Sequence, residues 1–210
     1  MITVDEIADN FKKLDNSRLE HLALNPRGLR KEIIPVLIGE IKRRNMKSSL
    51  IEWINFETNI YEGLEREFLI GEIKDSFCSL CNKNSGLKGY EFHTKISFFI
   101  TIMNKSDIKI ICQTCAGRKR LESMMTTFFL GWWSINGILS TPFVLMSDLY
   151  NSLSPKKQSE AIINDFIDNN TGLLRINKEK KLSINDVIKR VNYKETQIRA
   201  EQIILELIAS

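Results

Sequence analysis

The residues best suited to chemistry in this chain are four cysteines, which occur as two Cys-x-x-Cys pairs. They are all the cysteine that the sequence contains. Two thiolates three residues apart, in a tight turn, can both bind the same metal ion. Two such turns together supply the four sulfur ligands of a tetrahedral zinc site. The spacing therefore predicts one bound Zn²⁺ with Cys78, Cys81, Cys112 and Cys115 as its ligands.

A site built from four cysteines is typical of a structural zinc centre. A catalytic zinc usually has three protein ligands and an open position, and a histidine or carboxylate is often among them. The only histidines are His21 and His93, and we expect His93 to be a surface or packing residue. The sequence also lacks a phosphate-binding Gly-x-x-x-x-Gly-Lys motif, a dinucleotide-binding Gly-x-Gly-x-x-Gly motif and a nucleophile elbow. We therefore expect a protein that is not an enzyme.

Composition is that of a globular protein, with 43% hydrophobic and 27% charged residues in a chain of 210. The first residues, from Met1, do not show the basic and then apolar pattern of a secretory signal. Paired thiols without such a signal favour a reducing compartment and metal binding over disulfides. We therefore expect a cytoplasmic protein, and the abundance of Ile, Lys and Asn suggests a bacterial source.

The region between the cysteine pairs has the pattern of β-strands. Residues 90–103 are rich in aromatic and β-branched side chains, 104–107 (Asn-Lys-Ser-Asp) is a turn signal, and 108–111 runs directly into Cys112. The predicted order is metal-binding turn, strand, turn, strand, metal-binding turn. This order is typical of a zinc ribbon, which we place at residues 77–120.

An uncharged stretch follows the predicted ribbon. Ser123 to Ser147 contains twenty-five residues without one charge, which is long enough for a bilayer crossing of about 20 residues. Gly131, Gly137 and Pro142 interrupt it, however, and would divide it into two half-helices. We favour a buried apolar helical hairpin over residues 121–153. Membrane contact through residues 123–147 is the alternative.

The segments on either side of these regions have helical patterns. Capping boxes at Thr3/Glu6 and at Ser17/Glu20 predict two helix starts, and large apolar residues over 49–74 predict helix that contributes to the core. The fold class is therefore α+β and mostly α, with helical parts at residues 1–76 and 154–210 around the ribbon and the hairpin.

The C-terminal part is expected to contain three helices. Ser154-Pro155 begins a helix that ends near Asn169, where Asn-Thr-Gly at 170–172 is a stop signal. A short extended turn is expected over 173–181, a second helix after Ser183, and a last amphipathic helix over 200–208.

The segment from the ribbon onward resembles a little-characterised group of bacterial proteins. Cys112-Gln-Thr-Cys115 is followed by Gly131-Trp-Trp-Ser-Ile-Asn-Gly137-Ile-Leu-Ser-Thr141-Pro142. That group pairs a Cys-x-x-Cys ribbon with an apolar hairpin of the type GWWG-x-x-x-G-x-x-x-TP, and Ser134 stands where it has glycine. The resemblance covers about residues 78–150. It implies a metal site and an apolar hairpin that is membrane-associated, and it implies no activity.

Three functions are compatible with these features. The favoured one is a non-enzymatic zinc-binding interaction protein, of the adaptor or immunity type, with a protein partner. A nucleic-acid-binding ribbon is the second, although a net charge of +4 is a small excess. The third is a membrane-peripheral protein that inserts Trp132 and Trp133 at the interface. The basic residues on which a nucleic-acid surface would depend are Arg27, Arg30, Lys31, Lys42, Arg43, Arg44, Lys47 and the triplet 118–120.

Overall fold

The computed structural model describes residues 3–98, 101–130, 146, 155–180 and 183–192. It is mostly helical, with one antiparallel sheet of two strands. The described residues form two compact units, which we treat separately. The first contains residues 3–62 together with the described residues of 167–183, and the second contains the described residues of 63–166 and 184–192. The four successive regions expected from the sequence remain a prediction.

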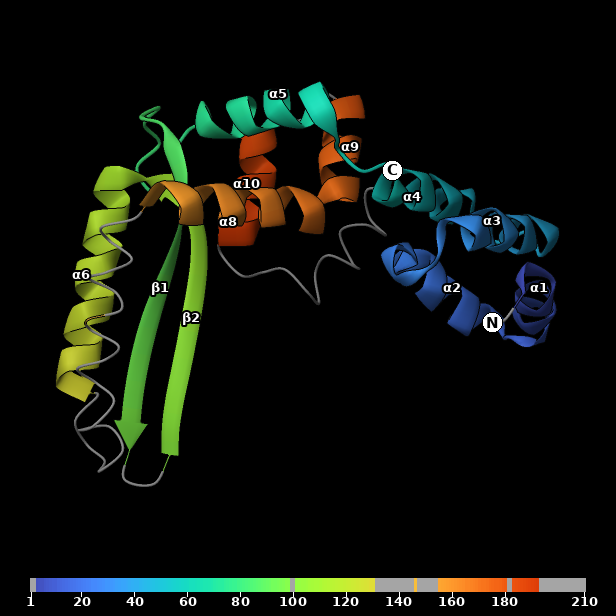
Figure 1. Cartoon of the computed structure of the whole chain (residues 1–210), viewed down its shortest axis with the longest axis horizontal. Helices are drawn as coiled ribbons and strands as arrows, with labels where there is room; N and C mark the ends of the chain where they lie inside the picture. Colours follow the sequence, from blue (N-terminus) through green and yellow to red (C-terminus); the bar gives the residue numbers. More distant parts are fainter. Residues whose placement is uncertain (1–2, 99–100, 131–145, 147–154, 181–182, 193–210) are drawn as a thin grey trace. The chain divides into compact units, whose positions relative to one another are not determined.

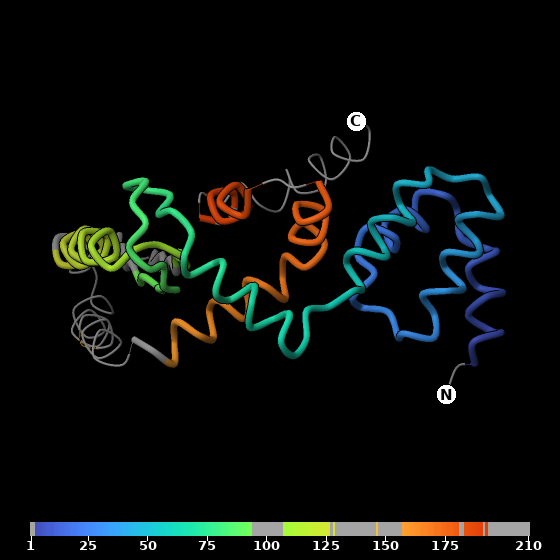
Figure 2. Tube along the Cα trace, turned by 90° about the horizontal axis from the view of Figure 1, so that it is seen from above, coloured from blue at the N-terminus to red at the C-terminus, as the bar shows by residue number. Residues whose placement is uncertain are grey.

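The first unit is built from short helices (Figure 2). Its apolar core contains Leu19 and Ala23 of α2, Leu37 and Ile41 of α3, and Ile54 of α4, all fully buried. The elements are α1 (Val4–Lys13), α2 (Asn16–Leu24), the 3-10 turns η1 (Pro26–Gly28) and η2 (Lys31–Ile33), α3 (Ile34–Arg43), α4 (Ser48–Thr58) and α9 (Thr171–Glu179).

Helix starts in the first unit confirm one of the two predicted capping boxes. The Thr3 side chain accepts a hydrogen bond from the Glu6 N–H, and the Glu6 carboxylate accepts one from the Thr3 N–H. The capping box predicted at Ser17 is wrong. Asp15 caps α2 instead, because its carboxylate accepts a 2.8 Å hydrogen bond from the Arg18 N–H.

Helix α9 occupies residues for which the sequence predicted an extended turn. The expected stop at 170–172 ends α8 at Asn169, but Thr171 immediately begins the next helix. Gly172 lies where α9 meets α4: a Cβ there would overlap the Glu57 carboxylate and lie 2.8 Å from the Trp53 ring. Tertiary packing on α4 therefore outweighs the local stop signal.

The described part of the second unit combines the sheet with several helices. Its elements are α5 (Gly63–Lys74), β1 (Leu87–Phe98), β2 (Thr101–Cys112), α6 (Gln113–Leu130), most of α8 (Pro155–Asn169) and α10 (Ile184–Asn192). Helix α6 runs alongside the two-stranded hairpin (Figure 1). The expected single helical stretch over 49–74 is in fact two helices, α4 and α5, which belong to different units.

The hairpin register places the base of the hairpin next to the cysteines. Leu87 pairs with Cys112, and Phe98 pairs with Thr101 at the far end. The turn predicted at 104–107 is wrong, because these four residues pair with residues 92–95 of β1. Long strand pairing overrides the local turn preference of Asn104 and Asp107.

Helix α8 approaches β1 closely at a glycine. The Gly89 N–H donates a 2.9 Å hydrogen bond to the Ser159 Oγ, in a buried position. A Cβ at Gly89 would overlap the Ile162 side chain. The absence of a side chain at this strand position is therefore what lets α8 lie against β1 at this point.

Candidate metal centre

The first cysteine pair lies in the loop between α5 and β1. The Cys78 N–H donates to the Lys83 carbonyl at 3.0 Å, and the Asn82 N–H donates to the Cys78 carbonyl at 2.7 Å. Asn82 takes a left-handed backbone conformation with φ of 55°, which asparagine adopts more readily than most residues. These bonds close a tight turn that holds Cys78 and Cys81 on the same side.

The second pair lies at a junction between a strand and a helix, whereas the sequence predicted another metal-binding turn. Cys112 is the last residue of β2, and Cys115 lies in the first turn of α6, which begins at Gln113. The predicted ribbon over 77–120 thus has its two strands, but residues 113–120 are helical.

The four sulfur atoms form one cluster. The Sγ atoms of Cys78, Cys81, Cys112 and Cys115 all lie within 4.8 Å of one another, and Cys81 and Cys112 are 3.6 Å apart. Four sulfurs arranged tetrahedrally about a zinc ion, at about 2.3 Å each, would lie about 3.8 Å apart. The cluster could therefore hold a metal ion. All four cysteines are free of disulfides.

Burial differs among the four thiols. Cys78, Cys112 and Cys115 are buried, and Cys81 is partly exposed. The Cys112 N–H also points at the Cys78 Sγ, at 3.5 Å. An N–H donor directed at sulfur stabilises a thiolate, which is the form that binds metals.

The environment separates the pKa values of the two thiols at the strand–helix junction. Burial works against ionisation of Cys112, but hydrogen bonds from the backbone and side chain of Cys115, with others from Ser85 and Cys78, lower the pKa of the Cys112 thiol to about 6. Burial raises the pKa of the Cys115 thiol to about 12, with the neighbouring sulfurs adding to the effect. Without a metal ion, the hydrogen bonds therefore favour the thiolate at Cys112, whereas burial favours the neutral thiol at Cys115.

A buried asparagine ties α10 to both sides of the centre. The Asn192 side chain accepts from the Ile110 N–H and donates to the Ile110 carbonyl, both at 2.8 Å. It also donates to the Ser79 Oγ at 2.8 Å. Ile110 precedes Cys112 by two residues, and Ser79 follows Cys78. No sequence signal identified Asn192, because a single buried asparagine has no periodicity or spacing by which to recognise it.

The two histidines considered as functional residues are not part of the cysteine cluster. The His93 imidazole lies 3.8 Å from Glu91, and its backbone carbonyl accepts a 2.6 Å hydrogen bond from Ser123. His21 lies in α2 of the first unit. Within the described residues, the cysteine cluster is the only group of three or more His, Cys, Asp or Glu side chains placed to hold a metal ion.

The basic triplet after the last cysteine lies on the first turns of α6. Arg118 is exposed, and Lys119 forms a 2.7 Å ion pair with Glu122. The pairing of Lys119 reduces the positive charge that this surface could offer to phosphates.

The predicted apolar hairpin lies largely outside the described residues. Helix α6 covers its beginning, up to Leu130, and 131–145 and 147–154, which include Trp132 and Trp133, are not described. Among the helices of the described part of the chain, none combines the length and hydrophobicity that a bilayer crossing requires.

Comparison of the chain with models of protein families, with curated proteins and with solved structures finds no match.

Proposed function

We propose that the protein binds one zinc ion through Cys78, Cys81, Cys112 and Cys115 and acts as a non-enzymatic interaction protein in the cytoplasm. The observation that carries this proposal is the sulfur cluster, in which all four Sγ atoms lie within 4.8 Å of one another. Soft thiolates in a tetrahedral set of this size are the ligands typical of structural zinc.

The centre has a structural role in this proposal. Four thiolates fill the coordination sphere of zinc, so no position is left for a substrate or an activated water. The ion instead joins two pieces of backbone that are distant in sequence: the loop after α5, and the junction at which β2 ends and α6 begins. Zinc binding thereby contributes directly to the folding free energy of the second unit.

The experiment that tests this role measures metal content and folding together. Purified protein should contain one zinc per chain, and removal of zinc by a chelator should release the amide protection of β1, β2 and α6 in hydrogen exchange. Cys115→Ser should give the same result. Thr114→Ser, an exposed position between the two cysteines, is the matched control and should keep its zinc. A variant without zinc that retains full protection would contradict the proposal.

A second candidate is a membrane-peripheral function, favoured by an apolar row on α6. Leu121, Met125 and Phe128 are 60%, 51% and 54% exposed, and they recur at positions i, i+4 and i+7 of one helix. In this candidate, the row and the rest of residues 123–147 would contact the membrane together. Flotation with phospholipid vesicles tests it: Leu121→Asp/Met125→Asp should reduce flotation and Glu122→Gln should not. Protein that stays entirely in the lipid-free fraction would exclude it.

A further inference from the structure

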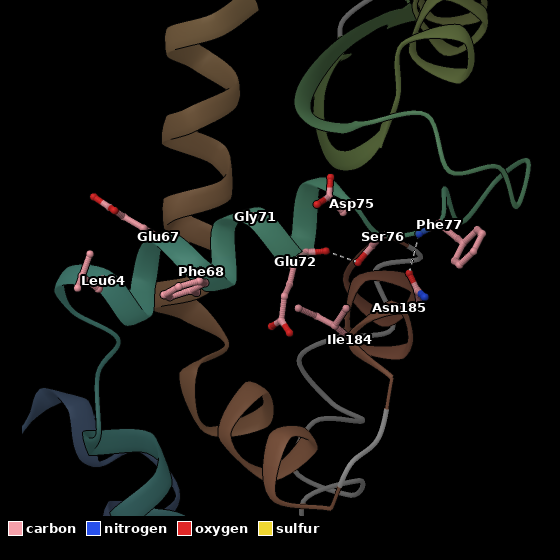
Figure 3. Close-up of a pocket in the computed structure, with 10 residues that line it drawn as sticks. All are labelled: Leu64, Glu67, Phe68, Gly71, Glu72, Asp75, Ser76, Phe77, Ile184 and Asn185. Carbon is pink, nitrogen blue, oxygen red and sulfur yellow. Dashed lines mark hydrogen bonds between the residues drawn. The ribbon is translucent and has the colours of Figure 1, made fainter.

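A groove on the second unit, between α5 and α10, is a separate surface on the same unit as the metal centre. It has a volume of about 680 Å³. Figure 3 shows its residues on α5, on the link to the first cysteine and at the start of α10. They are Leu64, Glu67, Phe68, Gly71, Glu72, Asp75, Ser76, Phe77, Ile184 and Asn185.

The apolar part of the groove is unusually exposed. Leu64 is 73% exposed, Phe68 is 76% exposed and Phe77 is 50% exposed. The sequence predicted that large side chains over 49–74 contribute to the core, and Leu69 and Ile73 of α5 do so. Leu64 and Phe68 lie on another face of the same helix. Exposed large apolar side chains that lie together mark an interaction surface rather than core.

Gly71 leaves an open place beside this apolar face. It follows Phe68 by three residues, and a Cβ built there meets nothing within 4 Å. Glycine inside a helix costs about 1 kcal/mol relative to alanine. The open space at Gly71 would accept a side chain from a partner that lies along α5.

Two hydrogen bonds hold the lining of the groove in position without a partner. The Ser76 Oγ donates to the Glu72 carbonyl at 2.7 Å, and the Phe77 N–H donates to the Asn185 Oδ1 at 3.0 Å. Both bonds are drawn in Figure 3. Phe77 directly precedes Cys78, so a metal bound by the cysteines would hold the end of the groove as well. A preformed surface loses less entropy when a partner binds.

The charge of the groove specifies the partner. Its lining contains three exposed acidic residues, Glu67, Glu72 and Asp75, and no lysine or arginine. In Figure 3 the Glu72 carboxylate extends toward Ile184, whereas the Glu67 side chain points away from Ile184. The Glu67 and Glu72 carboxylates thus lie on opposite sides of Leu64 and Phe68. The chain as a whole is positively charged, with a net charge of +4, so this acidic surface is a local exception.

We infer that the groove binds an amphipathic helix of another protein, one with apolar side chains along one face and lysine or arginine beside them. This rests on the proposed function as an interaction protein and gives the chemistry of its partner. A second copy of the same surface would bring like charges together. The chain's own residues 193–210 contain two basic and three acidic residues, so this segment lacks the required excess of positive charge.

A synthetic peptide with leucines at i, i+4 and i+7 and lysines at the other positions is the probe. Fluorescence anisotropy with the zinc-loaded full chain should show saturable binding that weakens as salt is raised, because the acidic side chains contribute. A peptide with glutamate in place of each lysine should bind at least about tenfold more weakly. A scrambled peptide of the same composition should bind at least about tenfold more weakly as well, because it lacks the apolar face.

Two substitutions connect binding to the groove. Gly71→Arg places a long cation in the open space, and Phe68→Ala removes the most exposed apolar ring. Each should weaken peptide binding by about tenfold or more. Gly39→Arg is the matched control, because Gly39 is also a helical glycine whose Cβ would meet nothing within 4 Å. It is exposed and lies on α3 in the first unit. It should bind the peptide as the unchanged protein does.

Zinc content is measured on every variant, which separates this inference from the proposed function. A protein that binds zinc but not the lysine peptide, or that binds it equally well after Gly71→Arg, would overturn the groove inference alone. A dimer in sedimentation that Gly71→Arg dissociates would assign the groove to a second copy, and competition by a peptide of residues 193–210 would assign it to the chain itself. Either result would overturn the inference.

Discussion

The Sγ of Cys81 lies 3.6 Å from the Sγ of Cys112, although the two residues are 31 positions apart in the chain. Cys81 belongs to the loop after α5, and Cys112 ends β2. The contact therefore closes the base of the β1–β2 hairpin against the loop that precedes it. In the proposed zinc-bound protein, one ion would join these two segments, which the Asn192 side chain also bridges through Ser79 and Ile110.

Replacing a cysteine should weaken zinc binding. Cys78→Ser removes a fully buried sulfur, and Cys81→Ser removes the most exposed one. Both should weaken zinc binding by more than about 100-fold, because a ligand is lost rather than a supporting group. Competition with a chromogenic chelator would measure the loss of affinity, and a variant that keeps the zinc affinity of the unchanged protein would contradict the prediction.

Asn192 should support the centre without touching the metal. Asn192→Ala leaves the buried N–H and carbonyl of Ile110 without their side-chain partner. We expect a loss of about 2 kcal/mol in the free energy of unfolding and about a tenfold weaker zinc affinity. Denaturant titration and chelator competition would measure both. Lys189→Ala, an exposed position on the same helix, is the control and should change neither. An Asn192→Ala protein as stable as the control would show that the network is dispensable.

Gly172 should tolerate no side chain. Gly172→Ala would place a Cβ against the Glu57 carboxylate and the Trp53 ring, where Glu57 accepts a 2.7 Å hydrogen bond from the Gly172 N–H. We expect a loss of about 1–3 kcal/mol in the free energy of unfolding, as for overpacked cores. Gly39→Ala, at a helical glycine with open space, should instead stabilise by up to about 1 kcal/mol. Chemical denaturation of both variants tests the contrast, and equal effects would refute it.

Glu40 should make the first unit sensitive to acid. Hydrogen bonds from Arg43, and then from Arg44, hold the pKa of the Glu40 carboxyl at about 2, against an ordinary value of 4.5, although burial opposes this. Because the folded-state pKa is the lower one, its contribution to stability is complete above about pH 4.5 and is lost as the pH falls toward 2. Glu40→Gln should cost about 1–3 kcal/mol at neutral pH. It should also flatten the decline in stability over that pH range.

Asp9 provides the comparison for that experiment. It forms an exposed ion pair with Lys12, at 2.8 Å, on the surface of the same unit. Exposed pairs of this kind contribute little to stability. Asp9→Asn should therefore leave the melting temperature at neutral pH nearly unchanged. A Glu40→Gln variant that behaves like Asp9→Asn across the whole pH range would show that the ion pairs of the buried Glu40 with Arg43 and Arg44 are not a source of stability.

The grouping of the four cysteines could be predicted from sequence because it depends on spacing alone. The Cys-x-x-Cys pairs and the β-rich residues between them anticipated a hairpin with sulfur ligands at its base. They could not anticipate that Cys115 lies on a helix, because residues 113–120 have weak apolar periodicity and their conformation is set by packing of α6 against β1.

Long-range contacts account for the remaining differences. Residues 104–107 form strand instead of a turn, because they pair with residues 92–95. Residues after 170 form helix instead of a loop, because Gly172 packs on Glu57 and Trp53. Leu64 and Phe68 could not be distinguished from core residues by sequence, because periodicity shows that a helix has an apolar face and not whether that face is covered.

X-ray absorption spectroscopy at the zinc edge, on protein purified without added metal, tests the central claim most directly. The account predicts one zinc per chain with four sulfur neighbours at about 2.3 Å and no nitrogen or oxygen in the first shell. A zinc shell that contains nitrogen or oxygen, or a folded protein with far less than one zinc per chain, would contradict it.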